Sequence, residues 1–226
     1  MNYEKSYNDI YQSLLSEEKA GSISSGSLDI LHGMRAAYSA DANRRAHRHM
    51  NAGALVSSFL RRSTFDPLNP FHGCYHFGKY SAFTDSHLAV FLESSKFPLK
   101  GSLFSSGPVP PFSRVVPSGD GYNDSVAVSR YDITLFNLTR PFDSVGHVSL
   151  LGDRGGVVSF RAYYLQFLCE IFDVPEITIR FYPFPSMVSV PGCGFAVLAF
   201  TAVNELRFLS PKMAVRHDKN FSSYFA

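Results

Sequence analysis

The chain has 226 residues, of which 45% are hydrophobic and 15% aromatic, and its formal net charge is +2. This apolar content excludes a disordered chain, and the small net charge excludes a protein that is basic throughout. The length fits one domain preceded by an N-terminal extension, which is the organisation we expect.

The first 64 residues are predicted to form a helical, arginine-rich N-terminal arm. Between Tyr3 and Glu18, apolar residues recur at steps of three and four, the pattern of one helical face. Residues 28–62 contain no proline and favour one or two further helices, interrupted near Gly53. Six arginines fall within residues 34–62, against the single acid Asp41: Arg35, Arg44, Arg45, Arg48, Arg61 and Arg62.

Turn-forming residues just after Phe65 mark the start of a β-rich core domain, predicted over residues 65–226. Residues 160–172 favour a helix, and residues 101–125 are too rich in proline and glycine for regular structure. The predicted fold class is mostly β: an antiparallel β-sandwich or jelly-roll-like domain with a helical N-terminal arm. Eight short strands are expected, at residues 74–80, 87–93, 126–138, 147–151, 157–160, 176–181, 195–203 and 206–209.

The densest group of candidate metal ligands is His72, Cys74 and His76, which share one face if this segment is a strand. His87, on the next predicted strand, could add a fourth ligand. The spacing matches no established zinc pattern, and a turn that leads into a strand explains it equally well. We therefore predict no metal and no cofactor, and keep these four residues as candidates.

Two glycine-rich segments could carry a catalytic turn. Cys193 lies between two glycines, but nothing in the sequence lowers its pKa, so we interpret the segment as a tight turn before a buried strand. The run from Gly152 to Gly156 is superficially similar to a metallophosphatase element but lacks the companion motifs, so we predict a hairpin turn. Because phosphate-loop, dinucleotide and nucleophile-elbow motifs are also absent, no catalytic residue is assigned.

The compartment follows from the cysteines and the N-terminus. Cys74, Cys169 and Cys193 are widely spaced and odd in number, which argues against a disulfide framework. The N-terminus lacks the apolar run of a signal peptide, and no segment approaches the roughly 20 apolar residues of a membrane span. We expect reduced thiols, no membrane partner and an intracellular, cytoplasmic location.

The arginine cluster is the strongest functional signal. Guanidinium groups bridge phosphate oxygens with paired hydrogen bonds, and neutralising acids are nearly missing from this segment. The alternative is a solvated helix face whose charges pair with acids elsewhere in the chain or in a neighbouring subunit. The predicted nucleic-acid-binding residues are Arg35, Arg44, Arg45, Arg48, Arg61 and Arg62.

A basic helical arm followed by short strands, with no catalytic signature, resembles the layout of a single-jelly-roll viral coat protein over residues 65–215. The resemblance implies a structural, self-assembling capsid subunit in a virion, with copies of itself and nucleic acid as partners. Two alternatives stay open. One is a non-catalytic subunit of a large heteromeric assembly, such as a phage connector or tail or an organellar complex; the other is an enzyme with a His/Cys site around residues 72–87.

Overall fold

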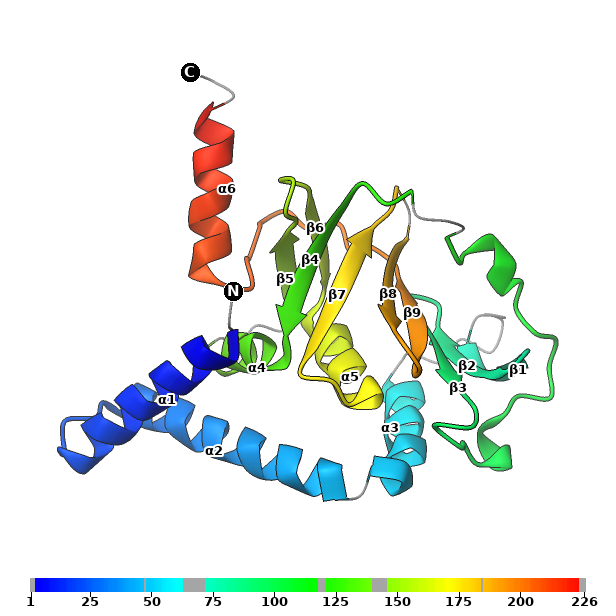
Figure 1. Cartoon of the computed structure of the whole chain (residues 1–226), viewed down its shortest axis with the longest axis horizontal. Helices are drawn as coiled ribbons and strands as arrows, with labels where there is room; N and C mark the ends of the chain where they lie inside the picture. Colours follow the sequence, from blue (N-terminus) through cyan, green and yellow to red (C-terminus); the bar gives the residue numbers. More distant parts are fainter. Residues whose placement is uncertain are drawn as a thin grey trace.

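The computed structural model describes residues 3–46, 48–62, 72–117, 121–139, 146–183 and 185–223. Three helices come first along this part of the chain, and runs of strands separated by single helices follow (Figure 1). The helices are α1 (Tyr3–Lys19), α2 (Ser25–Ala46), α3 (Arg48–Arg62), α4 (Arg130–Thr139), α5 (Ala162–Phe172) and α6 (Pro211–Ser223), with short 3-10 helices η1 (Gly101–Leu103) and η2 (Phe112–Arg114). The strands are β1 (His72–Phe77), β2 (Tyr80–Asp85), β3 (Leu88–Glu93), β4 (Asp124–Ser129), β5 (His147–Leu151), β6 (Val157–Arg161), β7 (Glu176–Phe181), β8 (Ser186–Val190) and β9 (Gly194–Leu198).

One antiparallel sheet of seven strands organises the molecule. Its order is β1-β2-β3-β9-β8-β7-β4, and each neighbouring pair is antiparallel. Strands β5 and β6 form a separate two-stranded hairpin. The prediction of a mostly-β sandwich or jelly roll is corrected: the described chain is mixed α/β, because much of the sheet's apolar face is covered by helices and not by a second large sheet.

The sheet contains two similar units that meet at its centre. Helix α3 is followed by β1, β2 and β3, and helix α5 is followed by β7, β8 and β9. The antiparallel β3–β9 ladder, with Val90 opposite Ala196, joins the units, and the other strands of each unit follow outward in mirrored order. Phe59 of α3 stacks on Phe167 of α5 with ring centroids 4.7 Å apart, so both helices cover the same face.

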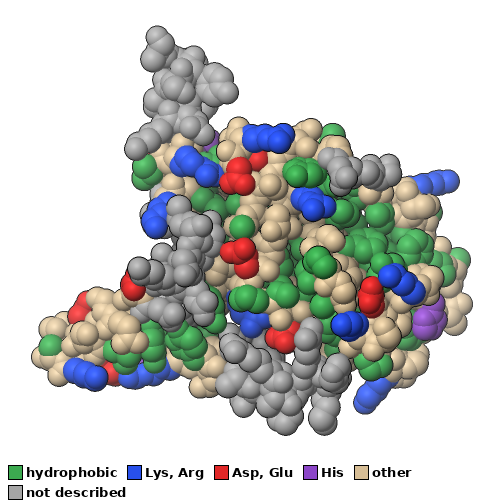
Figure 2. Space-filling model, in the orientation of Figure 1, with side chains coloured by type: hydrophobic (Ala, Val, Ile, Leu, Met, Phe, Trp, Pro, Cys, Tyr) green, Lys and Arg blue, Asp and Glu red, His purple; other side chains and the backbone are tan. Residues whose placement is uncertain are grey.

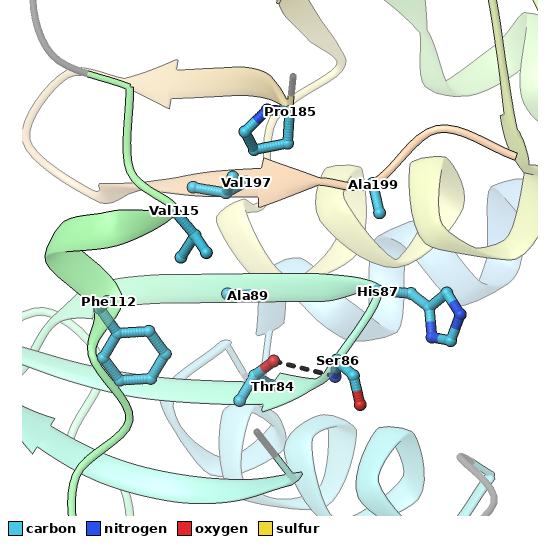
Figure 3. A pocket seen from close by; sticks show the side chains of 9 residues that line it. All are labelled: Thr84, Ser86, His87, Ala89, Phe112, Val115, Pro185, Val197 and Ala199. Atoms are coloured by element: carbon cyan, nitrogen blue, oxygen red, sulfur yellow. Dashed lines mark hydrogen bonds between the residues drawn. The ribbon is translucent and has the colours of Figure 1, made fainter. Parts of the chain in front are cut away.

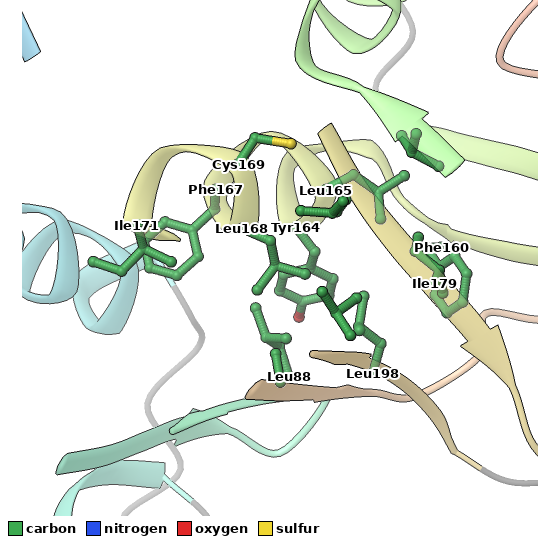
Figure 4. Close-up of a cluster of buried hydrophobic side chains, with 14 of the residues drawn as sticks. Leu88, Phe160, Tyr164, Leu165, Phe167, Leu168, Cys169, Ile171, Ile179 and Leu198 are labelled. Atoms are coloured by element: carbon green, nitrogen blue, oxygen red, sulfur yellow. The ribbon is translucent and has the colours of Figure 1, made fainter. Parts of the chain in front are cut away.

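The two faces of the sheet carry different apolar layers. On the helix face, Leu88, Ile179 and Leu198 pack against the buried side of α5 (Figure 4). On the opposite face, the linker between β3 and β4 places Phe112 against Phe91, with ring centroids 5.0 Å apart. Hydrophobic side chains also gather at the surface over the half of the molecule that holds β1–β3 and this linker (Figure 2).

The N-terminal helices contact the rest of the chain through two apolar surfaces. Helices α1 and α2 form a hairpin whose Leu14, Leu31 and Met34 pack with Tyr131 of α4. Helix α3 instead buries Phe59 in the main core, together with Ala52 and Val56. The first helices therefore pack on the β-rich part, while the predicted boundary at residues 64 and 65 lies outside the described residues.

Several elements differ from the sequence prediction. The run 126–138, predicted as one strand, divides after Ser129, whose hydroxyl accepts the N–H of Tyr131 at 3.1 Å and starts α4. From there Tyr131 and Leu135 pack with α1 and α2, while Ile133 packs in the main core, so the apolar residues have helical spacing. Strands β2 and β8 and helix α6 were not predicted, and α3 continues through Gly53 without the expected break. Residues 206–209 form no strand; they pair with β5 through the isolated bridge between Phe208 and Ser149.

Candidate binding pocket

An apolar pocket opens on the face of the sheet opposite α3 and α5, where β2, β3 and β9 meet the β3–β4 linker (Figure 3). Its volume is about 90 Å³. The polar side chains of Ser86 and His87 lie at one end of the pocket. Phe112 and Val115 close the other end. The lining residues are Thr84, Ser86, His87, Ala89, Phe112, Val115, Pro185, Val197 and Ala199.

The turn between β2 and β3 forms the polar end. The Asp85 side chain folds back onto this turn, and its Oδ1 accepts the N–H groups of His87 at 3.0 Å and Leu88 at 2.9 Å. The Thr84 hydroxyl accepts the N–H of Ser86 at 3.1 Å. Ser86 has φ of 77°, in the left-handed region that residues with a Cβ rarely occupy. These bonds hold Ser86 and His87 at the mouth of the pocket.

The linker forms the apolar end. Phe112 is only 1% exposed, because its ring packs among Phe91, Tyr75 and Phe77. These residues lie on the face of the sheet opposite α3 and α5. Its carbonyl oxygen accepts the N–H of Val115 at 3.0 Å, which fixes Val115 beside it. The proline-rich linker was predicted to be irregular, yet this part is anchored as one wall of the pocket.

The lining of the pocket is mostly apolar. Six of the nine lining residues are apolar, and the polar ones are Thr84, Ser86 and His87. No thiol, lysine or carboxylate is among them, so the lining offers His87 no such nucleophile or acidic orienting partner. The pocket therefore presents apolar contacts with a few hydrogen-bonding groups at one end, the composition of a recognition site.

Of the four His/Cys candidates, the three with described side chains, Cys74, His76 and His87, are not brought together. Burial raises the pKa of the Cys74 thiol to about 12, so it stays protonated and is a poor ligand or nucleophile. The exposed ring of His76 stacks on Phe104 at 3.9 Å, and His87 lies in the pocket, while the side chain of His72 falls outside the described residues. Among the described side chains, no three His, Cys, Asp or Glu residues could jointly hold a metal ion.

Both glycine-rich segments are turns, as predicted. Cys193 lies in the turn between β8 and β9, and a Cβ at the following Gly194 would collide with the carbonyl oxygen of Phe91. The segment from Gly152 to Gly156 joins β5 to β6. The buried carboxylate of Asp124 accepts backbone N–H groups there, including that of Gly156 at 2.8 Å.

The arginine cluster lies on α2 and α3. Arg35 makes two hydrogen bonds with the Glu18 carboxylate, at 2.6 and 3.0 Å, so this arginine follows the alternative in which charges pair within the chain. Arg61 is exposed near the end of α3, and its Nε donates to the carbonyl of Ser57 at 3.2 Å. The side chains of the remaining four lie outside the described part of the molecule: Arg44, Arg45, Arg48 and Arg62.

Sequence reasoning missed the pocket because its walls come from segments more than 100 residues apart, which only the fold brings together. One local signal was available. The polar run from Thr84 to His87 separates two apolar stretches, and an aspartate followed by serine often forms a side-chain-stabilised turn. Such a turn indicates a hairpin connection but does not indicate the pocket beside it.

None of the described helices is long and apolar enough to span a membrane.

No protein-family model and no curated protein sequence matches this chain. Among solved structures, it is similar to the DNA polymerase III β subunit of Borrelia burgdorferi, with 11% identity and a TM-score of 0.47 over 68% of this chain and 63% of that one. The sliding clamp of Pseudomonas aeruginosa gives 12% identity and a TM-score of 0.47 over 67% and 64% of the two chains. The Helicobacter pylori β clamp bound to a DNA ligase peptide gives 11% and 0.36 over 55% and 41%. This chain thus spans less than two thirds of these proteins.

The coat-protein interpretation is therefore corrected. A jelly roll packs two large sheets against each other, whereas the described residues form one seven-stranded sheet with α3 and α5 on one face. The three solved structures are described as a DNA polymerase III β subunit, a sliding clamp and a β clamp, and none of them as a coat protein. The predicted capsid function, with the virion and jelly-roll assignments, is withdrawn.

Proposed function

We propose that this protein is a non-catalytic binding protein that captures a partner protein by an aliphatic side chain inserted into the pocket between Thr84 and Ala199. The observation that carries this function is the pocket itself. It is apolar on most of its surface and offers hydroxyl and imidazole groups at one end only. A peptide provides the matching chemistry, with an apolar side chain and adjacent backbone groups that can hydrogen-bond.

The pocket volume selects this ligand class. Small-molecule and cofactor sites usually occupy roughly 300–1,000 Å³, and an engineered cavity of roughly 150 Å³ binds benzene. A cavity of about 90 Å³ is smaller than either and suits one aliphatic side chain. Binding strength would then depend on that anchor and on contacts that the flanking peptide makes around the mouth of the pocket.

A role beside DNA belongs to the same proposal. One similar structure is a clamp bound to a DNA ligase peptide, and for this chain the corresponding role would be to hold a partner protein near nucleic acid. This role is supported by the separate positions of the pocket and the arginine cluster in the fold. The pocket opens on the face away from α3 and α5, while the arginine cluster lies on α2 and α3.

Peptide display against the full chain tests the pocket. Selected peptides should be enriched in Leu, Ile, Val or Met at one position, and fluorescence polarisation of the labelled best binder gives its affinity. Ala199→Leu fills the pocket and should weaken binding by roughly tenfold or more, because one buried aliphatic anchor contributes about 1.5–3 kcal/mol. Ala202→Leu, at an exposed position outside the pocket, is the matched control.

An absence of aliphatic enrichment would contradict the peptide function. So would a selected peptide that binds wild type and Ala199→Leu equally well, since the binding site would then lie elsewhere.

A second function, nucleic-acid binding by the arginine cluster, is favoured by the exposed position of Arg61 on α3. Replacing Arg44, Arg45, Arg48, Arg61 and Arg62 by alanine should leave the far-UV circular dichroism spectrum unchanged. Fluorescence anisotropy with labelled duplex DNA should show weaker binding with a smaller salt dependence, because each lost phosphate contact reduces the slope by about 0.9. Arg35→Ala, which removes the arginine paired with Glu18, is the control and should change DNA binding little. Unchanged affinity and salt slope in the quintuple variant would reject this function.

A further inference from the structure

We infer that Asp85, which does not itself line the pocket, is the positioning residue that holds the pocket's polar end in its binding shape; this role rests on the proposed function of the pocket. The Asp85 side chain lies between the pocket turn and the first turn of α5. Its Oδ1 accepts the N–H groups of His87 and Leu88, and its Oδ2 accepts the hydroxyl of Tyr164 at 2.7 Å. Asp85 is 7% exposed, so these bonds form away from bulk water.

The Asp85 carboxylate stabilises the unfavourable backbone conformation of Ser86. Ser86 adopts a positive φ that costs a residue with a Cβ free energy, and such a conformation persists only where surrounding contacts determine it. Here the N–H groups of the two residues that follow Ser86 donate to Oδ1 of Asp85, and these two hydrogen bonds hold the Ser86 conformation. The carbonyl of His87 in turn accepts the N–H of Ala199 at 2.8 Å, next to the paired residues Leu88 and Leu198 of the β3–β9 ladder. Release of the carboxylate would therefore shift lining residues from both β3 and β9.

Tyr164 fixes the carboxylate from the helix side of the sheet. Its side chain is 1% exposed, and Tyr163 adds a longer hydroxyl contact to the same oxygen at 3.4 Å. Burial raises the pKa of Tyr164, and the Asp85 charge raises it further, so the phenol remains a donor at neutral pH. A buried carboxylate requires such donors, because an unpaired charge away from water is strongly unfavourable. The hydrogen bond between Tyr164 and Asp85 thus links α5 to the turn that forms the polar end of the pocket on the opposite face of the sheet.

The test compares three variants at this site, Asp85→Ala, Asp85→Asn and Tyr164→Phe, with Asp124→Asn. The control removes the charge of another buried carboxylate, which accepts three backbone N–H bonds and holds a turn without pocket-lining residues. The probe is the fluorescein-labelled peptide selected on the wild-type chain. Its affinity, the melting temperature and the amide exchange rates of His87 and Leu88 are measured for each full-length protein.

Asp85→Ala should weaken peptide binding by roughly tenfold or more and speed exchange at His87 and Leu88, since charge-assisted bonds of this kind are lost. Asp85→Asn retains an acceptor oxygen and should lose roughly threefold, as should Tyr164→Phe. Asp124→Asn should lower the melting temperature with unchanged affinity. If Asp85→Ala does not fold, Asp85→Asn and Tyr164→Phe still decide the question.

Equal affinity in wild type, Asp85→Asn and Tyr164→Phe would overturn the positioning role and leave the pocket's function standing. Affinity that falls in Asp124→Asn to the same extent would also overturn it, because the loss would then follow general stability. If the wild-type chain yields no peptide that depends on the pocket, the proposed function fails first and the positioning role fails with it. Faster exchange at His87 and Leu88 would then show only that Asp85 holds the turn.

Discussion

Two turns in this molecule are each held by a buried aspartate that accepts backbone N–H groups, but the packing around the two carboxylates differs. At the β2–β3 turn, the Asp85 carboxylate accepts the N–H groups of His87 and Leu88. At the β5–β6 turn, the Asp124 carboxylate accepts the N–H groups of Arg154 at 2.9 Å and Gly156 at 2.8 Å. Both aspartates are buried, at 7% and 4% exposed.

The difference lies in the space around each carboxylate. Asp124 is enclosed by the turn itself, and a Cβ added at Gly152 would collide with its carboxyl group. Asp85 is supported from the helix side by Tyr164, and its turn borders an open cavity. The same hydrogen-bonding motif therefore closes the fold at Asp124 and borders a pocket at Asp85. The surrounding packing decides which role it has.

A substitution at Gly152 should disrupt the β5–β6 turn without changing either aspartate. Gly152→Ala places a methyl group against the Asp124 carboxyl and should lower the free energy of unfolding by about 3 kcal/mol, because the site cannot expand without losing its N–H bonds. Urea denaturation followed by circular dichroism measures this change. Gly101→Ala, where nothing lies within 4 Å of an added Cβ, is the control and should change stability by about 0.5 kcal/mol or less. A small loss in Gly152→Ala would show that the Asp124 turn is not tightly closed.

A third buried carboxylate oxygen, on Asp132, contrasts with those of Asp85 and Asp124. Asp132, in the first turn of α4, has a buried Oδ2 with no hydrogen-bond partner in the described part of the chain. Burial raises its pKa to about 6, against the lowering effect of Lys212, and Glu176 raises it further. An acid whose pKa is higher in the folded state destabilises the fold once it ionises. The penalty is absent below about pH 3, grows as the pH rises from about 4 towards 6 and is complete above the folded-state pKa.

Asp132→Asn should therefore stabilise the protein by about 1 kcal/mol at pH 7.5, after allowance for partial exposure, and by little at pH 4. Denaturation curves of both proteins at the two pH values measure the difference. A gain of equal size at both values would show that the change acts through packing or helix propensity and not through charge.

Local patterns predicted several elements because their signals need no tertiary partner. The apolar spacing from Tyr3 to Glu18 predicted α1, and the runs at residues 147–151 and 176–181 match β5 and β7. The helix predicted at residues 160–172 corresponds to α5. By contrast, the 126–138 run contains apolar residues at both spacings, so only the packing of Tyr131 against the α1–α2 hairpin reveals that a helix begins at Arg130.

The sequence by itself determined the helical character of the N-terminal segment, the clustering of arginines and the positions of turns such as Gly152–Gly156, because these depend on residues close together in the chain. It did not determine that α3–β1–β2–β3 and α5–β7–β8–β9 form matching units around the β3–β9 ladder, since strand order is set by pairing between distant segments. The pocket belongs to the same class of feature. Val197 reaches Ala89 and Phe112 only after the sheet and the linker have assembled, so the position of the pocket depends on tertiary packing between distant segments.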